Sequence, residues 1–192
     1  SQNTEVTDGY LVITAKNEPY GGSNYTSSRI VTKDLQSFQY GRVDIRAKLP
    51  QGKGIWPALW MLGNSFTTIG WPACGEIDIM EMVGNNFTNE GNNTIYGTAH
   101  WDNNGDHAQF GGQSQLSSGK YSDEFHVFSI IWDSNSIKWY RDDSLFQQID
   151  ISVSGLSEFQ QPFFFIFNVA VGGNWPGNPN SSTPFPQELK VD

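Results

Sequence analysis

The chain has 192 residues, enough for one β-rich domain with a substantial core, and we expect a single domain over residues 1–192. Its net charge of −9 and pI of about 4.6 argue against a nucleic-acid partner, because phosphate binding needs clustered Lys and Arg. The sequence has no apolar run of transmembrane length, so no membrane partner is expected. The one cysteine, Cys74, is expected to be a small packed side chain.

Three segments near the start of the chain, 9–18, 24–33 and 40–49, alternate apolar and polar residues. This alternation predicts antiparallel strands in a sheet that is buried on one face and open to solvent on the other. The charged residues of 40–49 are expected on the solvent face.

The next segment, 51–62 (QGKGIWPALWML), predicts a strand interrupted by Pro57, which marks a sheet edge or a bulge. Trp56 and Trp60 are four residues apart, so a strand places both indoles on one face. Two indoles on a groove floor form a stacking platform for sugar rings, with core packing as the alternative. Trp71, in the following loop, is open to the same two interpretations.

Residues 70–84 (GWPACGEIDIMEMVG) carry three carboxylates within an apolar, strand-like run. In a regular strand Glu76 and Asp78 share one face while Glu81 points to the other, which buries at least one carboxylate without a partner. One extra residue around Ile79-Met80 resets the alternation, so we predict a β-bulge there. All three carboxylates then line one groove.

Two carboxylates separated by a third suit the cleavage of a glycosidic bond, in which one acid protonates the leaving oxygen and the other attacks or activates water. The middle residue, Asp78, can share a proton and so keep one glutamate protonated and the other ionised. A solvated acidic strand face or a calcium site are the alternatives that the spacing leaves open.

The second half of the chain begins with a polar turn at 85–93 and a strand over 93–102 that should pair with the acidic strand. His100 lies on this strand, either near the carboxylates or as a structural residue. Residues 103–124 have no clear periodicity and predict either a loop over the groove or two short polar strands.

Two paired strands, 125–132 and 136–141, follow, with Trp132 and Trp139 expected in the core. Residues 163–171 are almost all apolar and predict a strand buried on both faces. The loop 172–179 (GGNWPGNP) carries Trp175, and its Gly and Pro content fits a rigid groove rim.

Taken together, GEIDIMEM, the preceding GWPAC, the upstream GIWPALWML and the downstream NVAVGGNWPG resemble family 16 glycoside hydrolases, in particular the laminarinase-type endo-1,3-β-glucanases with an E-x-D-x-x-E motif. The resemblance implies an all-β fold, a concanavalin A-like β-sandwich jelly roll of two antiparallel sheets with an open concave cleft. It implies a retaining mechanism with Glu76 as nucleophile, Asp78 as assisting acid and Glu81 as general acid/base.

The resemblance also implies further site residues. Substrate contacts are expected from Asn24, Arg29, Trp56, Trp60, Trp71, His100 and Trp175, and Trp101 is expected to shape a further subsite. No cofactor is expected for catalysis. A structural calcium is implied near Gly9 and Asp192, although two residues fall short of the oxygen ligands that calcium requires.

Family members typically have a strand before the position of Ser1 and another after Asp192, and this sequence contains neither. Such a chain is expected to be a monomer or to be completed by separate segments that cover the sheet edges. The substrate is expected to be a β-glucan outside the cell, and the protein is therefore expected to be secreted. The alternatives are a non-catalytic β-glucan-binding module, or a hydrolase or transglycosylase that acts on mixed-linkage glucan or a red-algal galactan.

Overall fold

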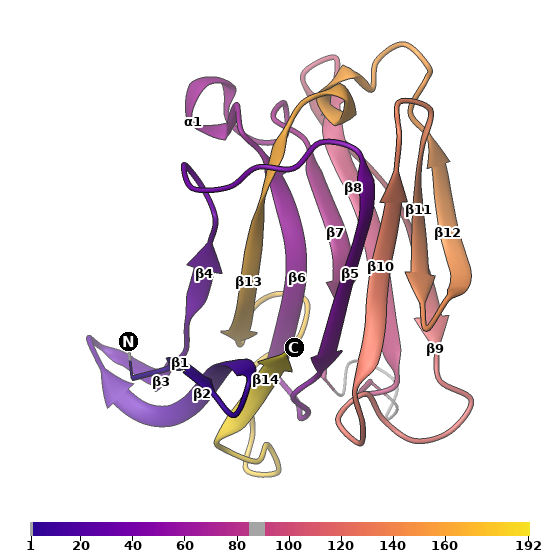
Figure 1. Ribbon diagram of the computed structural model, residues 1–192. Coiled ribbons are helices and arrows are strands. Elements are labelled where there is room, and N and C mark those ends of the chain that lie inside the picture. Colours follow the sequence, from indigo (N-terminus) through magenta and orange to yellow (C-terminus); the bar gives the residue numbers. More distant parts are fainter. Residues whose placement is uncertain (1, 85–90) are drawn as a thin grey trace.

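The computed structural model describes residues 2–84 and 91–192, so residues 85–90 of the predicted polar turn lie outside the described part. Two antiparallel β-sheets pack face to face (Figure 1), which confirms the predicted all-β sandwich. The outer sheet has eight strands in the order β1-β2-β14-β5-β10-β11-β12, with β3 paired to β2. The second sheet has six strands in the order β4-β13-β6-β7-β8-β9.

The strands of the outer sheet are β1 (Thr4–Thr7), β2 (Tyr10–Tyr20), β3 (Ser23–Thr26), β5 (Gly41–Lys48), β10 (His126–Trp132), β11 (Ser136–Arg141), β12 (Ser144–Asp150) and β14 (Gln187–Val191). Those of the second sheet are β4 (Arg29–Val31), β6 (Ile55–Gly63), β7 (Glu76–Glu81), β8 (Thr94–Asn103), β9 (Asp106–Gln115) and β13 (Phe163–Val171). Two short helices, α1 (Phe66–Ile69) and η1 (Ser157–Gln160), lie in connections. Within the described ranges, no helix has the length and apolar character to cross a membrane.

The core lies between the two sheets and is rich in aromatic side chains. Trp132 and Trp139 are fully buried there, as predicted, and so is Phe128. The Trp139 indole N–H donates a 2.8 Å hydrogen bond to the backbone carbonyl of Asp78 and so links the outer sheet to the middle of β7. Gly97 on β8 leaves the space for this indole, since a Cβ there would lie 2.5 Å from the ring.

Pro57 lies in a strand whose place in the sheet differs from one of the two expected. Strand β6 is central, between β13 and β7, so a sheet edge, one of the two expected alternatives, is excluded. The Pro57 carbonyl accepts from the backbone N–H of Met82, just beyond the last residue of β7. In an antiparallel sheet the N–H and C=O groups of one residue point to the same neighbouring strand. The position of the N–H that Pro57 lacks therefore faces the end of β7, where the pairing of the two strands has stopped and no hydrogen bond is lost.

One other expectation needs correction. The segment 24–33 is not one strand, because β3 belongs to the outer sheet and β4 to the second sheet. Strand β13 has the predicted bounds and, as predicted, buried residues on both faces, although only one face packs in the core between the sheets. Its other face carries Phe164, Ile166 and Asn168, and the first two pack in a small separate cluster with Leu62 and Cys74 on the opposite side of the sheet. Cys74 is 1% exposed, as expected of a packed thiol.

Residues 103–124, which the sequence left open between a loop and two short strands, contain one ten-residue strand, β9, at the edge of the second sheet. The charged residues of 40–49 lie on the outer face, as expected. Arg42 pairs with Asp44 and Asp143, and Arg46 pairs with Asp192 at 2.6 Å.

Candidate active site

The acidic strand β7 contains the predicted bulge. Asp78 lies opposite Trp60 and Met80 opposite Leu59, so Ile79 is the extra residue without a partner on β6. The ladder with β8 shifts between Asp78 and Glu81 in the same way. The bulge resets the alternation as anticipated: Ile77 and Met82 pack in the core between the sheets, and the three carboxyl groups lie on the opposite face.

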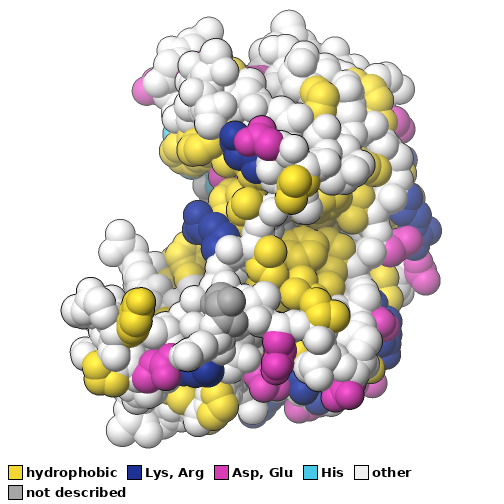
Figure 2. Space-filling model, turned by 60° about the vertical axis from the view of Figure 1, so that its left-hand side comes forward, with side chains coloured by type: hydrophobic (Ala, Val, Ile, Leu, Met, Phe, Trp, Pro, Cys, Tyr) yellow, Lys and Arg dark blue, Asp and Glu magenta, His cyan; other side chains and the backbone are white. Residues whose placement is uncertain are grey.

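That face of the second sheet is the floor of a groove. Figure 2 views the molecule from the side of β4, where the surface is hollowed and hydrophobic side chains gather. Paired residues on neighbouring strands share a face, so the floor can be followed from β4 to β9. Each strand contributes alternate residues: Arg29 and Val31 from β4; Phe164, Ile166, Asn168 and Ala170 from β13; Trp56, Ala58, Trp60 and Leu62 from β6; Tyr96, Thr98 and His100 from β8; His107 and Gln109 from β9.

Three tryptophans line the groove, and each donates its indole N–H at 2.9 Å. Trp71 donates to Glu76, Trp56 to Glu81 and Trp60 to Asn168. Trp56 and Trp60 are partly exposed on the same face and Trp71 is 46% exposed, so none of the three belongs to the core between the sheets, and their role as a platform for sugar rings stays a prediction. Sequence reasoning missed that two of them also hold the carboxylates.

His100 lies among the carboxyl groups, which is the first of the two alternatives that the sequence left open. Its Nε2 is 2.9 Å from Asp78 Oδ2 and 4.0 Å from Glu76 Oε1, and its Nδ1 is 2.9 Å from Nε2 of His107. The sequence interpretation missed His107. Asn104-Gly105 is a strong turn signal, and a hairpin at that turn brings residue 107 back beside the strand that carries His100.

The carboxyl groups are buried together, and this sets their acidity. Burial raises the pKa of Glu76 to about 8, and the nearby charge of Asp78 adds to the rise. Burial raises the pKa of Glu81 to about 7, opposed by the N–H of Trp56 and assisted by the charge of Glu76. Burial and the charge of Glu81 also raise the pKa of Asp78, which is 2% exposed. Since each charge raises the pKa of its neighbours, ionisation of one glutamate favours protonation of the other.

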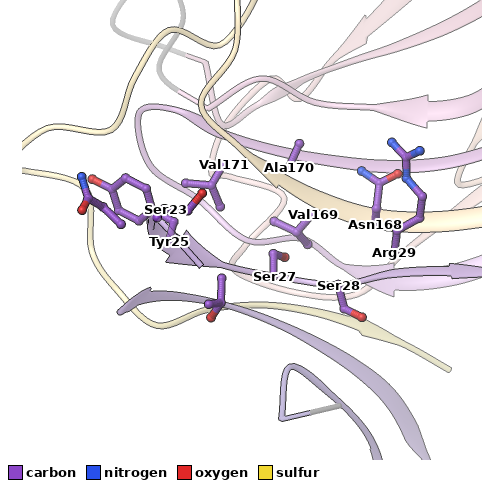
Figure 3. A pocket seen from close by; sticks show the side chains of 12 residues that line it. Ser23, Tyr25, Ser27, Ser28, Arg29, Asn168, Val169, Ala170 and Val171 are labelled. Carbon is purple, nitrogen blue, oxygen red and sulfur yellow. The ribbon is translucent and has the colours of Figure 1, made fainter. Parts of the chain in front are cut away.

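A pocket of about 480 Å³, with polar and apolar surface in similar amounts, adjoins the groove floor beyond β13. Asn24, Ser27 and Arg29 are among the residues that line it, and in Figure 3 the side chains of Arg29 and Asn168 lie side by side. The Arg29 guanidinium also lies over the Trp60 ring, 5.5 Å from its centre. The sequence interpretation of Arg29 and Asn24 as groove residues therefore fits their positions.

A second pocket, of about 500 Å³, lies against Glu76 and is mainly apolar; Trp60, Trp71 and Phe66 are part of its lining. Trp175 stands edge-on to both Trp56 and Tyr96, with ring centres 5.5 and 5.0 Å apart, and so belongs to the groove rim as expected. Trp101 does not shape a subsite. It points to the other face of β8 and packs against Phe159 in the core, because it is adjacent to His100 in an alternating strand.

The residues implied for calcium do not by themselves fit that ion. Gly9 lies in the turn between β1 and β2, and the Asp192 carboxylate pairs with Arg46. Calcium takes about six to eight oxygen ligands, and these two residues supply far fewer. Among the described residues, the one group of side chains with metal-binding geometry is Glu76, Asp78 and His100, whose donor atoms lie within 4.8 Å of one another.

The family model for glycosyl hydrolases family 16 matches residues 1–191. The chain belongs to this family. It is 40% identical to a β-glucanase from Rhodothermus marinus, over the whole chain and 68% of that protein, and 38% identical to glucan endo-1,3-β-glucosidase A1 from Niallia circulans, over the whole chain and 30% of that protein. The laminarinase catalytic domain from Thermotoga maritima is similar in structure, with a TM-score of 0.89 and 43% identity over the whole chain and 78% of that domain.

The family 16 chain spans between 28% and 68% of the length of these and another curated relative, clotting factor G alpha subunit from Tachypleus tridentatus. The match to the laminarinase domain supports the jelly-roll form of the predicted sandwich.

Proposed function

We propose that this chain is the catalytic domain of an endo-acting glycoside hydrolase that cleaves β-1,3-glucan with retention of anomeric configuration. The observation that carries the proposal is the bulge at Ile79, which brings Glu76, Asp78 and Glu81 to the floor of a tryptophan-lined groove. Such a groove suits binding of an internal stretch of an uncharged polymer, and the chain's own charge of −9 disfavours an anionic one. A polymeric substrate also favours action outside the cell.

In this mechanism the Glu76 carboxylate attacks the anomeric carbon while Glu81 protonates the departing glycosidic oxygen. The C–O bond of the glycoside breaks as the bond to Glu76 forms, which leaves a covalent glycosyl-enzyme. Glu81, now ionised, removes a proton from water, and the resulting nucleophile displaces Glu76. The mutual repulsion of the two glutamates favours a state with one proton between them, which this mechanism requires. The pKa of about 8 for Glu76 and about 7 for Glu81 places that proton on Glu76 before substrate binds, so the division of roles rests on the family resemblance.

The choice of β-1,3-glucan rests on the names of the relatives, which include laminarinases and glucan endo-1,3-β-glucosidases. Incubation with laminarin, lichenan and agarose, with products separated by size, tests it directly. We expect short oligosaccharides from laminarin from the earliest time points, with the β anomer formed first in NMR spectra. Initial release of the α anomer would contradict retention, and preferential cleavage of agarose would contradict the substrate.

The role of Glu76 can be tested separately. Glu76→Ala should lose hydrolysis but keep glucan binding, because covalent attack is lost while the indole platform remains. Azide should restore cleavage of an activated glycoside and yield the α-configured glycosyl azide. A β-configured product, or full activity in the variant, would contradict the assignment.

A non-catalytic role is the second candidate function, because a relative that is 34% identical over 77% of this chain is named a β-1,3-glucan-binding protein, from Penaeus monodon. Binding of laminarin by the wild-type chain without any release of sugar would favour that role. The complete carboxyl triad opposes it, since binding alone requires none of the three acids.

A further inference from the structure

The groove contains a row of hydrogen-bonded ionisable groups that extends beyond the carboxyl triad. A hydrogen bond joins Glu76 to Asp78. Asp78 Oδ2 is 2.9 Å from Nε2 of His100, and Nδ1 of His100 is 2.9 Å from Nε2 of His107. The two imidazole rings also stack, with centres 5.1 Å apart and planes 24° from parallel. Four groups in series therefore lead from Glu76 to His107.

The two ends of this row differ in access to solvent. The Asp78 side chain is 3% exposed and that of Glu76 19%, whereas His107 is exposed. His107 lies on the edge strand β9, two residues after the hairpin turn that contains Gly105. A sugar ring placed directly over Glu76 would cover the carboxyl end of the row, whereas His107 lies two strands further on, at the edge of the sheet.

The row can hold its protons in two ways. With Asp78 ionised, His100 donates from Nε2 to Asp78 and His107 donates from Nε2 to His100. With Asp78 protonated, Asp78 donates to His100 Nε2, and His100 donates from Nδ1 to His107. An N···N hydrogen bond has one donor and one acceptor, so the protonation of Asp78 and the tautomers of both histidines change together.

We propose that His100 and His107 form a proton relay through which Glu76 and Asp78 exchange a proton with solvent while glucan occupies the groove. In the outward step the Asp78 O–H proton moves to His100 Nε2, the His100 Nδ1 proton moves to His107 Nε2, and the His107 Nδ1 proton passes to water. Asp78 is left ionised and able to accept the proton of Glu76. Charge balances and no group is oxidised or reduced.

This relay rests on the proposed function, in which Glu76 attacks as a carboxylate, so any proton that it holds when glucan binds must leave first. Burial raises the pKa of Glu76 to about 8, so the group is mainly protonated at neutral pH and its proton needs a way out. Burial and the charge of His100 lower the pKa of His107, which keeps its ring neutral and able to accept a proton. His107 acts through His100 and is therefore a positioning residue rather than a catalytic one.

The other charged groups around the relay are few. Glu81 lies on the same strand as Asp78, and Asp102 pairs in register with His107 across β8 and β9. Asp106 precedes His107 at the start of β9, and Trp71 packs on the His107 ring, with centres 4.6 Å apart. The Asp102 carboxylate accepts from the backbone N–H of Gly105, so it supports the hairpin turn.

The variant His107→Gln distinguishes a His107 that transfers protons from one that only holds the His100 ring in place. A glutamine amide can donate to His100 Nδ1 and so hold that ring, but it cannot take up and release a proton. We expect kcat on laminarin to fall roughly tenfold, less than the loss on removal of a direct general acid or base, with KM unchanged. Added imidazole, at constant pH and ionic strength, should restore kcat. Asp106→Asn, which changes a neighbouring charge on the same hairpin, should behave as wild type in both respects.

Wild-type kcat in His107→Gln would show that His107 only supports the ring and would overturn the relay. A loss of kcat that imidazole does not restore would overturn it as well. NMR of ¹⁵N-labelled histidine in the free protein needs no turnover, so it tests the relay even if the proposed function fails. The tautomers of His100 and His107, read from their ring-nitrogen shifts, should change together as pH changes, and a change in one ring without the other would contradict the coupling.

Discussion

At the scale of single residues, the indole N–H groups of the groove have a specific chemical effect. Trp71 donates to Glu76 and Trp56 to Glu81, and each hydrogen bond stabilises the charged form of its carboxyl group. Both bonds lower pKa values that burial raises. Each tryptophan therefore tunes one acid of the pair in addition to any contact with a sugar.

The effect of Trp71 can be measured in the variant Trp71→Phe. Loss of the donor raises the pKa of Glu76 further, so the ionised nucleophile forms only at higher pH. The acidic limb of the pH profile of kcat/KM should shift upward by roughly one pH unit, the equivalent of one hydrogen bond to a charged group. The measurement is kcat/KM on laminarin across the pH range in which the protein stays folded.

Trp56→Phe is the matched variant for this experiment, since it removes the donor to Glu81 instead. Its alkaline limb should shift upward, because Glu81 as the acid keeps its proton to higher pH. A shift of either limb to lower pH, or the same limb moving in both variants, would contradict the assignment of the two hydrogen bonds.

The raised pKa of Glu76 also affects the stability of the fold. The pKa of Glu76 is about 8 in the folded protein, against 4.5 for an unperturbed glutamate. Between pH 4.5 and pH 8 the folded state holds a proton on Glu76 that the unfolded state has released. The stability that Glu76 contributes is therefore complete below pH 4.5 and is lost as pH rises towards 8. Glu76→Gln removes the titration. Its melting temperature should match wild type near pH 4.5 and exceed it increasingly towards pH 8.

The pKa of Asp133 is shifted in the opposite direction, so its contribution to stability has the opposite dependence on pH. The backbone N–H groups of Asn135 and Ser136 donate to its carboxylate and lower its pKa, so its contribution is present at neutral pH and is lost in acid. Asp133→Asn should melt below wild type at neutral pH and approach it as pH falls. A Glu76→Gln variant that is less stable than wild type at pH 8 would contradict the burial argument.

The sequence predicted the triad well because strand alternation is a local rule. The mismatch in parity between Asp78 and Glu81 was enough to require a bulge and to place it at Ile79. The sequence did not reveal His107 or Asn168 as partners of groove residues. Their contacts depend on which strands become neighbours, and one sequence carries little information about that.

At the scale of elements, the contact between β8 and β11 holds the acidic strand in place. Gly97 lies directly beneath the Trp139 indole, and that indole donates to the carbonyl of Asp78. Gly97→Ala would place a Cβ 2.5 Å from the ring, so the ring must move. We expect a loss of stability of about 1–3 kcal/mol, as for other overpacked cores, and a fall in kcat as β7 shifts. Chemical denaturation and laminarin kinetics measure both.

Gly112 on β9 pairs with Gly97 and is the matched control. The nearest atoms to a Cβ at Gly112 belong to the side chain of Gln147, at 3.0–3.1 Å and not at the 2.5 Å found for Gly97, so Gly112→Ala should lose clearly less stability and kcat than Gly97→Ala. Equal losses in the two variants would show that strand propensity, rather than the indole contact, accounts for the effect.

The sequence predicted some elements far better than others. Strands β11 and β13 have the predicted bounds, because both have continuous apolar patterns between clear breaks. Strand β9 was not resolved from a loop, since an edge strand with largely exposed residues has no apolar alternation. The central position of β6 was left open because proline in a strand marks an edge or a bulge, and the end of the ladder with β7 is visible only in the fold.

At the scale of the whole molecule, the groove has two chemically different surroundings. One pocket beside it has polar and apolar surface in similar amounts, with Asn24 and Ser27 among its lining residues, and the other is largely apolar and lies against Glu76. Both adjoin Arg29, whose guanidinium lies over Trp60. Sugar rings have polar edges and apolar faces, so one polymer in a fixed orientation can use both kinds of surface.

The outer sheet has a narrow join in its middle. Strand β14 pairs with β5 through Lys190 and Val191 alone, with one further bond from the Asp192 N–H to Arg46, whereas β5 pairs with β10 along its whole length. The outer sheet thus consists of two groups of strands, β1-β2-β14 and β5-β10-β11-β12, that among the described residues are hydrogen-bonded to each other only at the end of β14. In hydrogen–deuterium exchange, we expect amides of β14 and β2 to exchange much faster than those of β10 and β11. Equal protection in both groups would show that the join at the end of β14 opens no more readily than the rest of the sheet.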